Sequence, residues 1–193
     1  MEHLKSVGIC LVSSSLIMTI CWFIYLRTNK PSFVDVVWTL ATAIGGIYFL
    51  MQNQGHPTRV NLLSIMLTLW TARLSIHLIF RLRKRGEDSR YIRMKTNWSD
   101  KCHIKFFLFF QAQAIFVVIF ALPFLVAGSS QESIGKLDIL GLVTWIIGFL
   151  GVTLSDWQLE NFKSKPKRQV DDVCMIGLWK YSRHPNYFFE WLL

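Results

Sequence analysis

The sequence is short of acidic residues and of cysteines. Among its 193 residues, 12 Asp and Glu stand against 21 Lys and Arg, while 52% of the residues are hydrophobic. The four cysteines show no metal-ligand spacing, and two of them, Cys102 and Cys174, fall in predicted cytoplasmic loops, where thiols stay reduced. Neither a metal centre nor a disulfide framework is therefore expected. Internal repeats and low-complexity stretches are also lacking.

Charge is nearly absent from five long runs, which only Asp35, Arg73 and His77 interrupt. About 20 apolar residues cross a hydrocarbon core roughly 30 Å thick, and a chain in lipid must be helical to satisfy its backbone. We predict an all-α, polytopic transmembrane helix bundle in a single domain, residues 1–193. It has five full spans and the start of a sixth. The five runs are Val7–Leu26, Phe33–Met51, Val60–Phe80, Phe106–Gly128 and Ile139–Ser155.

The first run has no small-x-small cleavage site and is long for a signal peptide, so we interpret it as a retained helix. At the other end, residues 188–193 begin a further apolar segment that is too short to span. We expect the chain to be a fragment of a longer domain of about seven helices. In that case, we expect the chain alone to have little or no activity.

The basic residues gather in alternate connections between the runs. The positive-inside rule then places the N-terminus outside and these connections in the cytoplasm. If the protein is bacterial, we expect it in the inner membrane. The net charge of +9 thus indicates topology and a lipid-bilayer partner, not nucleic acid. The basic residues are Arg27, Lys30, Arg81, Arg83, Lys84, Arg85, Arg90, Arg93, Lys95, Lys101, Lys105, Lys163, Lys165, Lys167, Arg168, Lys180 and Arg183.

Polar residues inside the spans are costly and need a reason, since a charge at the bilayer centre costs about 2.5–3.5 kcal/mol on insertion scales. Arg73, His77 and Arg81 share one face of the helix predicted from the third run. Asp156, Glu160 and Lys163 share one face of the helix that continues from the fifth run. Together with Asp35 in the second run, they predict a polar pocket open to the cytoplasm. The alternative is a structural Asp35–Arg73 ion pair. Gln111 and Gln113 are interpreted as packing hydrogen bonds.

Near the end of the chain, residues 177–190 read GLWKYSRHPNYFFE. This segment is rich in polar groups for the mouth of a membrane helix. Pro185 suits the first turn of a helix, and Arg183 beside that helix end predicts a phosphate site. Asn186 and Glu190 lie four residues apart on one helical face, a spacing that suits recognition of a carboxamide.

These residues resemble the steroid 5-alpha-reductase superfamily, and its bacterial membrane members most of all. The segment 178–190 is similar to that family's NADPH-binding region. The segment 154–163, LSDWQLENFK, is similar to its upstream cofactor segment, with Lys163 where Arg is usual. The segment 85–91, RGEDSRY, is similar to the loop after the third helix in the bacterial members.

The resemblance implies an NADPH-dependent reductase of a carbon–carbon double bond conjugated to a carbonyl, in a lipophilic substrate that is sterol-like, isoprenoid or fatty-acyl. It implies that Asp156 and Lys163 hold the adenosine or phosphate part and that Asn186 and Glu190 lie near the nicotinamide. The other cofactor-binding residues that it implies are Arg90, Tyr91, Arg183, His184 and Tyr187. No Gly-x-Gly-x-x-Gly motif of a soluble dinucleotide fold occurs.

Two departures from the family pattern leave alternatives open. Phe189 stands where related motifs have glycine, and the family's catalytic Glu–Tyr pair has no clear counterpart. We therefore take Asp35, Arg73 and His77 as candidate catalytic residues. The first alternative is an S-adenosylmethionine-dependent membrane methyltransferase of the isoprenylcysteine or phospholipid type, which shares Arg-His-Pro-x-Tyr. The second is a membrane scaffold without turnover.

Overall fold

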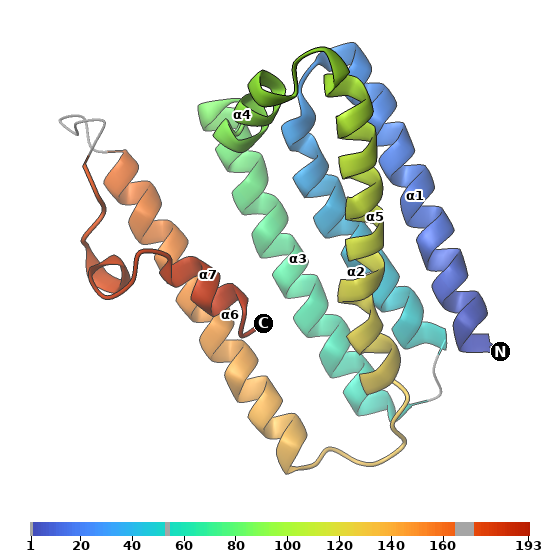
Figure 1. The fold of residues 1–193 in the computed structure, drawn as a ribbon. Coiled ribbons are helices and arrows are strands. Elements are labelled where there is room, and N and C mark those ends of the chain that lie inside the picture. Colours follow the sequence, from blue (N-terminus) through green and yellow to red (C-terminus); the bar gives the residue numbers. More distant parts are fainter. Residues whose placement is uncertain (1, 53–54, 165–171) are drawn as a thin grey trace. The chain divides into compact units, whose positions relative to one another are not determined.

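The computed structural model describes residues 2–52, 55–164 and 172–193, and within these ranges the chain is helical and has no strand. Five helices are long and apolar enough to cross a membrane, as predicted, so the chain is an integral, multi-pass membrane protein. They are α1 (Glu2–Thr28), α2 (Val34–Gln52), α3 (Pro57–Arg85), α5 (Cys102–Ala127) and α6 (Lys136–Lys163) (Figure 1). The short turn η1 (Pro31–Phe33) leads into α2.

The helices form two compact units, Met1–Ser133 and Ile134–Leu193. In the first unit, α2 packs against α1, α3 and α5, and α1 also packs against α5. The connection after α1 lies beside the connection after α3, because Lys95 Nζ donates to the carbonyl of Asn29 and the Asp88 N–H donates to Ser32 Oγ at 3.0 Å. Two of the predicted basic connections therefore share one end of this unit. Which side of the membrane that end faces stays a prediction.

The segment after α3 contains a helix that the sequence analysis did not predict. Helix α4 (Ser89–Trp98) follows Gly86, which ends α3 with a φ of +72°, and it leads into the turn η2 (Ser99–Lys101). Asp88 caps α4 by accepting the Arg90 N–H at 2.8 Å. Tyr91, Met94 and Trp98 pack into the core, at the spacing of an apolar helical face. That spacing and the capping aspartate were the sequence signals for α4. The many cations around them led us to interpret the segment as a basic loop.

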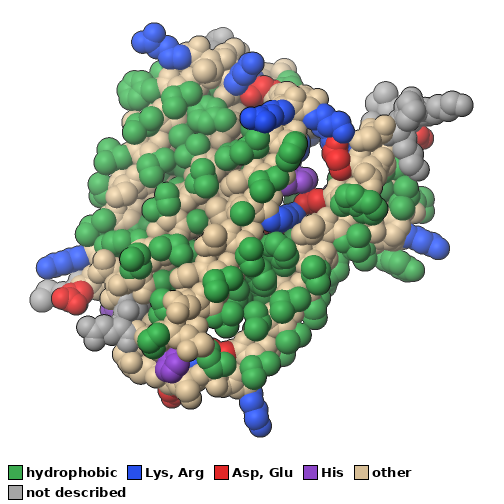
Figure 2. Space-filling view, turned by 180° about the vertical axis from the view of Figure 1, so that it is seen from behind, with side chains coloured by type: hydrophobic (Ala, Val, Ile, Leu, Met, Phe, Trp, Pro, Cys, Tyr) green, Lys and Arg blue, Asp and Glu red, His purple; other side chains and the backbone are tan. Residues whose placement is uncertain are grey.

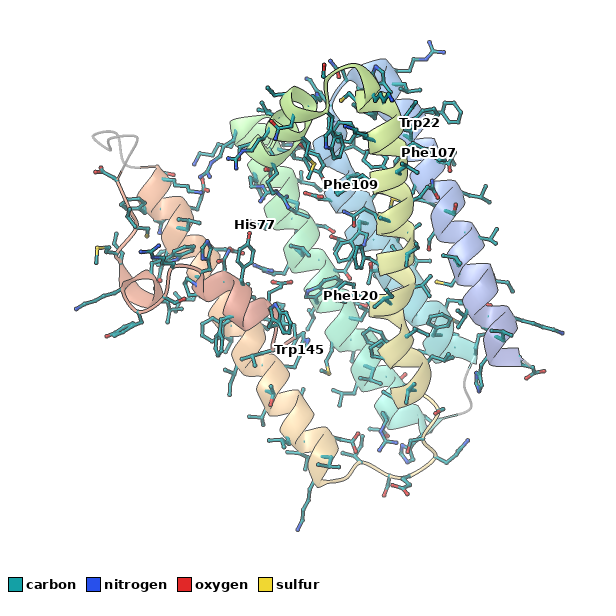
Figure 3. The ribbon with its side chains drawn as sticks, in the orientation of Figure 1. Trp22, His77, Phe107, Phe109, Phe120 and Trp145 are labelled. Carbon is teal, nitrogen blue, oxygen red and sulfur yellow. The ribbon has the colours of Figure 1, made fainter. Side chains whose placement is uncertain are left out.

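The core of the first unit is aromatic at the α4 end. Tyr25, Tyr91, Phe106 and Phe110 are fully buried, and the Phe106 ring lies 4.7 Å from Tyr25 and 4.9 Å from Trp98 between centroids. Trp22 and Phe107 lie side by side at this end (Figure 3), with centroids 5.2 Å apart. These aromatic contacts, edge-to-face or tilted, join α1, α4 and α5.

Polar side chains inside this bundle have partners on neighbouring helices. Gln111 of α5 accepts a hydrogen bond from Ser15 at 2.6 Å and donates one to Thr19 at 3.1 Å, both on α1. The geometry fits the packing interpretation of Gln111.

At the opposite end of this unit, Arg59 forms hydrogen bonds with the segment after α5. Its guanidinium is buried and donates to the carbonyls of Ser130 (3.1 Å), Glu132 (2.8 Å) and Ser133 (3.4 Å). Close by, Gly55 lies so near Gly128 that a Cβ would stand 1.8 Å from the Gly128 carbonyl oxygen. Backbone therefore packs directly on backbone at this end of the unit.

Large apolar side chains cover the outside of the helices, as Figure 2 shows over one face. Leu16, Ile44 and Phe80 are each 60% exposed or more. A water-soluble protein rarely exposes contiguous apolar surface on this scale, whereas lipid chains cover it favourably. This surface supports the transmembrane assignment independently of helix length.

The second unit is built on α6. After α6, the chain returns through the turn η3 (Gly177–Lys180) and the six-residue helix α7 (Pro185–Glu190), and both pack against α6. The predicted start of a sixth span corresponds to α7. Lys165, Lys167 and Arg168, predicted to be cytoplasmic, lie outside the described residues.

Replacing Gly55 by alanine is expected to destabilise the protein by about 1–3 kcal/mol, because the added methyl group overlaps a backbone oxygen that cannot move alone. Thermal unfolding in detergent measures the change. Gly8→Ala is the matched control, since nothing lies within 4 Å of its Cβ position in α1 and alanine favours a helix by about 0.5–1 kcal/mol. Equal melting temperatures for the two variants would contradict the packing described.

Candidate functional site

The segment that carries the cofactor-like motif is hydrogen-bonded onto α6. Gly177 has a φ of +56°, and its missing side chain leaves room for Gln158, whose Nε2 would lie 2.2 Å from a Cβ. The side-chain Oε1 of Gln158 accepts the Leu178 N–H at 2.9 Å, and the Trp179 indole N–H donates to the backbone carbonyl of Ser155 at 2.9 Å. Two of the three stretches that carry the family resemblance, 154–163 and 178–190, are therefore in direct contact.

This docking brings Asn186 to Asp156. Pro185 begins α7, and Asn186 Nδ2 donates to Asp156 Oδ1 at 3.2 Å. The Asn186 Oδ1 atom is buried, and no group in the described parts of the chain donates to it. Glu190 lies one helical turn beyond Asn186 on the same face of α7. A buried amide oxygen without a donor is a ready acceptor for a ligand N–H.

The remaining predicted cofactor residues of this unit lie at the surface. Arg183, His184 and Tyr187 are exposed, and the rings of His184 and Tyr187 stack with centroids 5.3 Å apart. Lys163 is the last residue of α6 and is also exposed. The structure thus divides the predicted set into an inner pair, Asp156 and Asn186, and an outer polar rim.

The Phe189 ring packs on a glycine of α6. A Cβ on Gly151 would lie 2.2–2.5 Å from three atoms of the Phe189 ring, and one on Gly148 would lie 3.0 Å from the Phe189 carbonyl oxygen. Gly151 therefore accepts the aromatic ring, and Gly148 accepts the backbone beside it. From the sequence, Phe189 was interpreted only as a departure from a glycine. The glycines spaced along α6 were the available signal for its packing partner.

A second polar cluster forms in the first unit, around Asp35. Tyr91 donates to Asp35 Oδ1 at 2.5 Å, and Arg90 pairs with Asp35 Oδ2 at 2.8 Å. Arg81 and Arg90 also pair with Asp88, at 2.7 and 3.0 Å. We call these five residues the Asp35–Asp88 cluster. It fastens α4 to α2 and α3.

The cluster shifts the pKa of its members. Burial, then the charge and hydrogen bond of Asp35, raise the pKa of the Tyr91 phenol far above its usual value, and Tyr91 is only 1% exposed. Burial alone would raise the pKa of Asp88, but hydrogen bonds from Arg90 and the charges of Arg90 and Arg81 outweigh it and lower the pKa. The hydrogen bond to Asp88 raises the pKa of Arg90. All three groups are thus held in their usual charge states at neutral pH.

Asp35, Arg90 and Tyr91, named from the sequence in two different roles, therefore lie in one cluster. The cations beside Asp35 are Arg81 and Arg90, whereas the alternative drawn from the sequence was a pair with Arg73. Arg73 and His77 are half-buried on α3, where Figure 3 labels His77. The predicted pocket joins α2 and α3 of one unit to α6 of the other, and it stays a prediction.

Replacing Gly151 by alanine is expected to destabilise the second unit by about 1–3 kcal/mol, because the methyl group overlaps the Phe189 ring. Removing the ring as well, in a Gly151→Ala, Phe189→Ala variant, should cost at least ~1 kcal/mol less than the sum of the two single changes. Thermal unfolding measures all three variants. Gly141→Ala, with open space at its Cβ position on the same helix, is the control. Strict additivity would show that the ring does not sit on Gly151.

Asp88→Asn is expected to cost about 1.5–3 kcal/mol at pH 7, because the variant keeps a capping side chain and loses the charge that holds two arginines. The folded-state pKa of Asp88 lies below its ordinary value of about 3.9, so its contribution is complete above that pH and is lost as pH falls through the folded pKa. The difference in melting temperature should therefore shrink in strong acid. Glu132→Gln, an exposed carboxylate, should show no such difference at either pH.

Comparison with known proteins supplies a family. A family model described as "Protein of unknown function (DUF1295)" matches residues 21–193. The chain is also 24% identical over 212 residues to an uncharacterized protein of Schizosaccharomyces pombe, C594.04c. That alignment covers 95% of this chain and 61% of the yeast protein, so the chain spans about three fifths of that relative's length. No solved structure matches significantly. The family match includes α2 to α7 and both polar clusters, and the chain belongs to the DUF1295 family.

Proposed function

We propose that the protein is a membrane-embedded, NADPH-dependent reductase that acts on a carbon–carbon double bond conjugated to a carbonyl. The observation that carries the proposal is the contact between Asp156 and Asn186, with the Asn186 Oδ1 atom buried beside it and without a donor. The resemblance of residues 154–163 and 178–190 to the cofactor segments of the steroid 5-alpha-reductase superfamily supports the same chemistry.

The Asp156–Asn186 pair suits a carboxamide. A carboxylate only accepts hydrogen bonds, so Asp156 fixes which end of the Asn186 amide faces it and leaves Oδ1 for another donor. A nicotinamide carboxamide supplies such a donor, and Glu190 on the same face of α7 can accept its second N–H. In this proposal, Asn186 and Glu190 orient the nicotinamide ring.

The exposed rim suits the phosphates of the cofactor. Lys163 and Arg183 supply cations, and the stacked rings of His184 and Tyr187 supply a flat, partly polar edge. Asp156 would contribute by orienting the Asn186 amide through their hydrogen bond. Arg90 and Tyr91 have a structural role in this proposal, because their contacts with Asp35 and Asp88 hold α4 against α2.

The bound cofactor supplies hydride, so the protein must polarise the substrate carbonyl and deliver a proton. Among the three candidate residues, Asp35 is already engaged by Tyr91 and two arginines, which leaves it poorly placed to act as an acid. Arg73 and His77 have side chains that suit these tasks. A histidine side chain can donate a proton, and an arginine can hold a developing oxyanion.

The substrate class follows from the surroundings. Apolar side chains cover the outside of the helices, so a compound that reaches the protein through lipid must itself be lipophilic. A sterol-like, isoprenoid or fatty-acyl enone has the required chemistry.

One observation favours a different function. The Phe189 ring packs on Gly151, and this internal packing would suit a scaffold that has kept the fold without turnover. Asn186 together with Glu190 favours the reductase over the methyltransferase alternative, whose motif does not require a carboxylate at the position of Glu190. Cofactor binding distinguishes all three.

The test is a thermal-shift titration with NADPH and, separately, with S-adenosylmethionine. NADPH should stabilise the protein, and Asn186→Ala or Glu190→Ala should each weaken its binding about tenfold or more, as loss of a buried hydrogen bond to a ligand does. Asn161→Ala, an exposed amide on α6, should leave binding unchanged. Stabilisation by S-adenosylmethionine alone would replace the reductase with a methyltransferase, and stabilisation by neither would favour the scaffold.

A further inference from the structure

One end of the first unit carries a dense group of exposed cations. This end is formed by the connection from α1 to α2 and by the segment from Arg81 to Lys105, and we call it the α4 end. Several Lys and Arg side chains are visible at this end of the unit in Figure 2. The exposed cations considered below are Arg27, Lys30, Arg83, Arg93, Lys101 and Lys105.

Acidic residues at this end are far fewer than its cations: Asp35, Glu87, Asp88 and Asp100. Asp35 and Asp88 are already paired with Arg81 and Arg90 inside the Asp35–Asp88 cluster. Glu87 and Asp100 are left to oppose the remaining cations, which outnumber them. The exposed cations at the rim therefore retain a strong net positive field.

The cations begin where the lipid-facing surface ends. Lys105 follows Ile104, which is 62% exposed, and Arg83 lies three residues beyond the exposed Phe80 on α3. Trp22 lies at the same level, since its indole N–H donates to the His103 carbonyl at 2.9 Å. Tryptophan and long cationic side chains are typical of the headgroup layer of a bilayer.

Helix α4 presents a mixed face to that layer. Tyr91, Met94 and Trp98 pack inward, whereas Ile92 and Arg93 are exposed. The Asp88 cap and the Tyr91–Asp35 hydrogen bond hold the helix in place. A short basic helix with an apolar inner face lies naturally in the interface, where its cations meet lipid phosphates.

We propose that the α4 end binds the headgroups of anionic phospholipids, with Arg83, Arg93 and Lys101 as its principal contacts. Guanidinium groups pair well with phosphate, and each cation near an anionic surface adds to the attraction. We take the partner to be lipid and not nucleic acid, because the cations border a lipid-facing surface. The inference is independent of the cofactor proposed for the second unit.

The experiment compares lipid retention by the purified protein and by an Arg83→Gln, Arg93→Gln, Lys101→Gln variant. Each is mixed with phosphatidylglycerol or phosphatidylcholine in detergent, and native mass spectrometry measures the bound lipid. The unchanged protein should prefer phosphatidylglycerol, and salt should weaken that preference. Each cation removed should lower the affinity for phosphatidylglycerol roughly fivefold, about a hundredfold for all three.

A matched single substitution separates local binding from overall charge. Lys5→Gln removes an exposed cation from the far end of α1 and should leave the preference unchanged, whereas Arg93→Gln alone should reduce it. Melting temperatures in phosphatidylcholine should be alike for all variants, because the changed side chains are exposed. The proposal fails if the triple variant keeps the full preference, or if Lys5→Gln weakens it as much as Arg93→Gln does. Stabilisation by an oligonucleotide but not by phosphatidylglycerol would also overturn it.

Discussion

Hydrocarbon offers no hydrogen-bond partners, and this constraint decides where the chain can place polar groups. Within α2, the hydroxyls of Thr39 and Thr42 bond back to carbonyls of their own helix. Gln111 takes both of its partners from α1. Charged side chains gather instead at the helix ends, where Asp35 and Asp88 share two arginines and Arg59 binds three carbonyls. Each of these charged contacts therefore holds a helix end in place as well as giving the charge a partner.

The same constraint shapes the second unit. The motif segment does not simply follow α6 along the chain, because Gln158 and Trp179 tie it to that helix by hydrogen bonds. Asn186 is consequently held against Asp156, and only one of its amide atoms lacks a partner. Fold and candidate site thus depend on the same contacts. A change that loosened Trp179 would also release Asn186, although the two side chains are seven residues apart.

Much of the fold was predictable, because a membrane span is recognised from the hydropathy of consecutive residues. It requires no knowledge of which helices pack together. The five spans follow directly from it, and the resemblance drew attention to both Asp156 and Asn186. Three-dimensional proximity was out of reach: Tyr91 and Asp35 are 56 positions apart, and no periodicity joins them. Helix α4 was missed for a related reason. Its apolar residues make sense only once the aromatic core beneath them is known.

The fit of Phe189 onto Gly151 has an evolutionary consequence. The two positions lie on different helices and are separated by 38 residues, yet neither side chain can grow without displacing the other. Substitutions at the two positions are therefore expected to be coupled, because a larger residue at position 151 needs a smaller one at position 189. With glycine at position 189, the contact that requires Gly151 disappears, and α6 could carry a bulkier residue there.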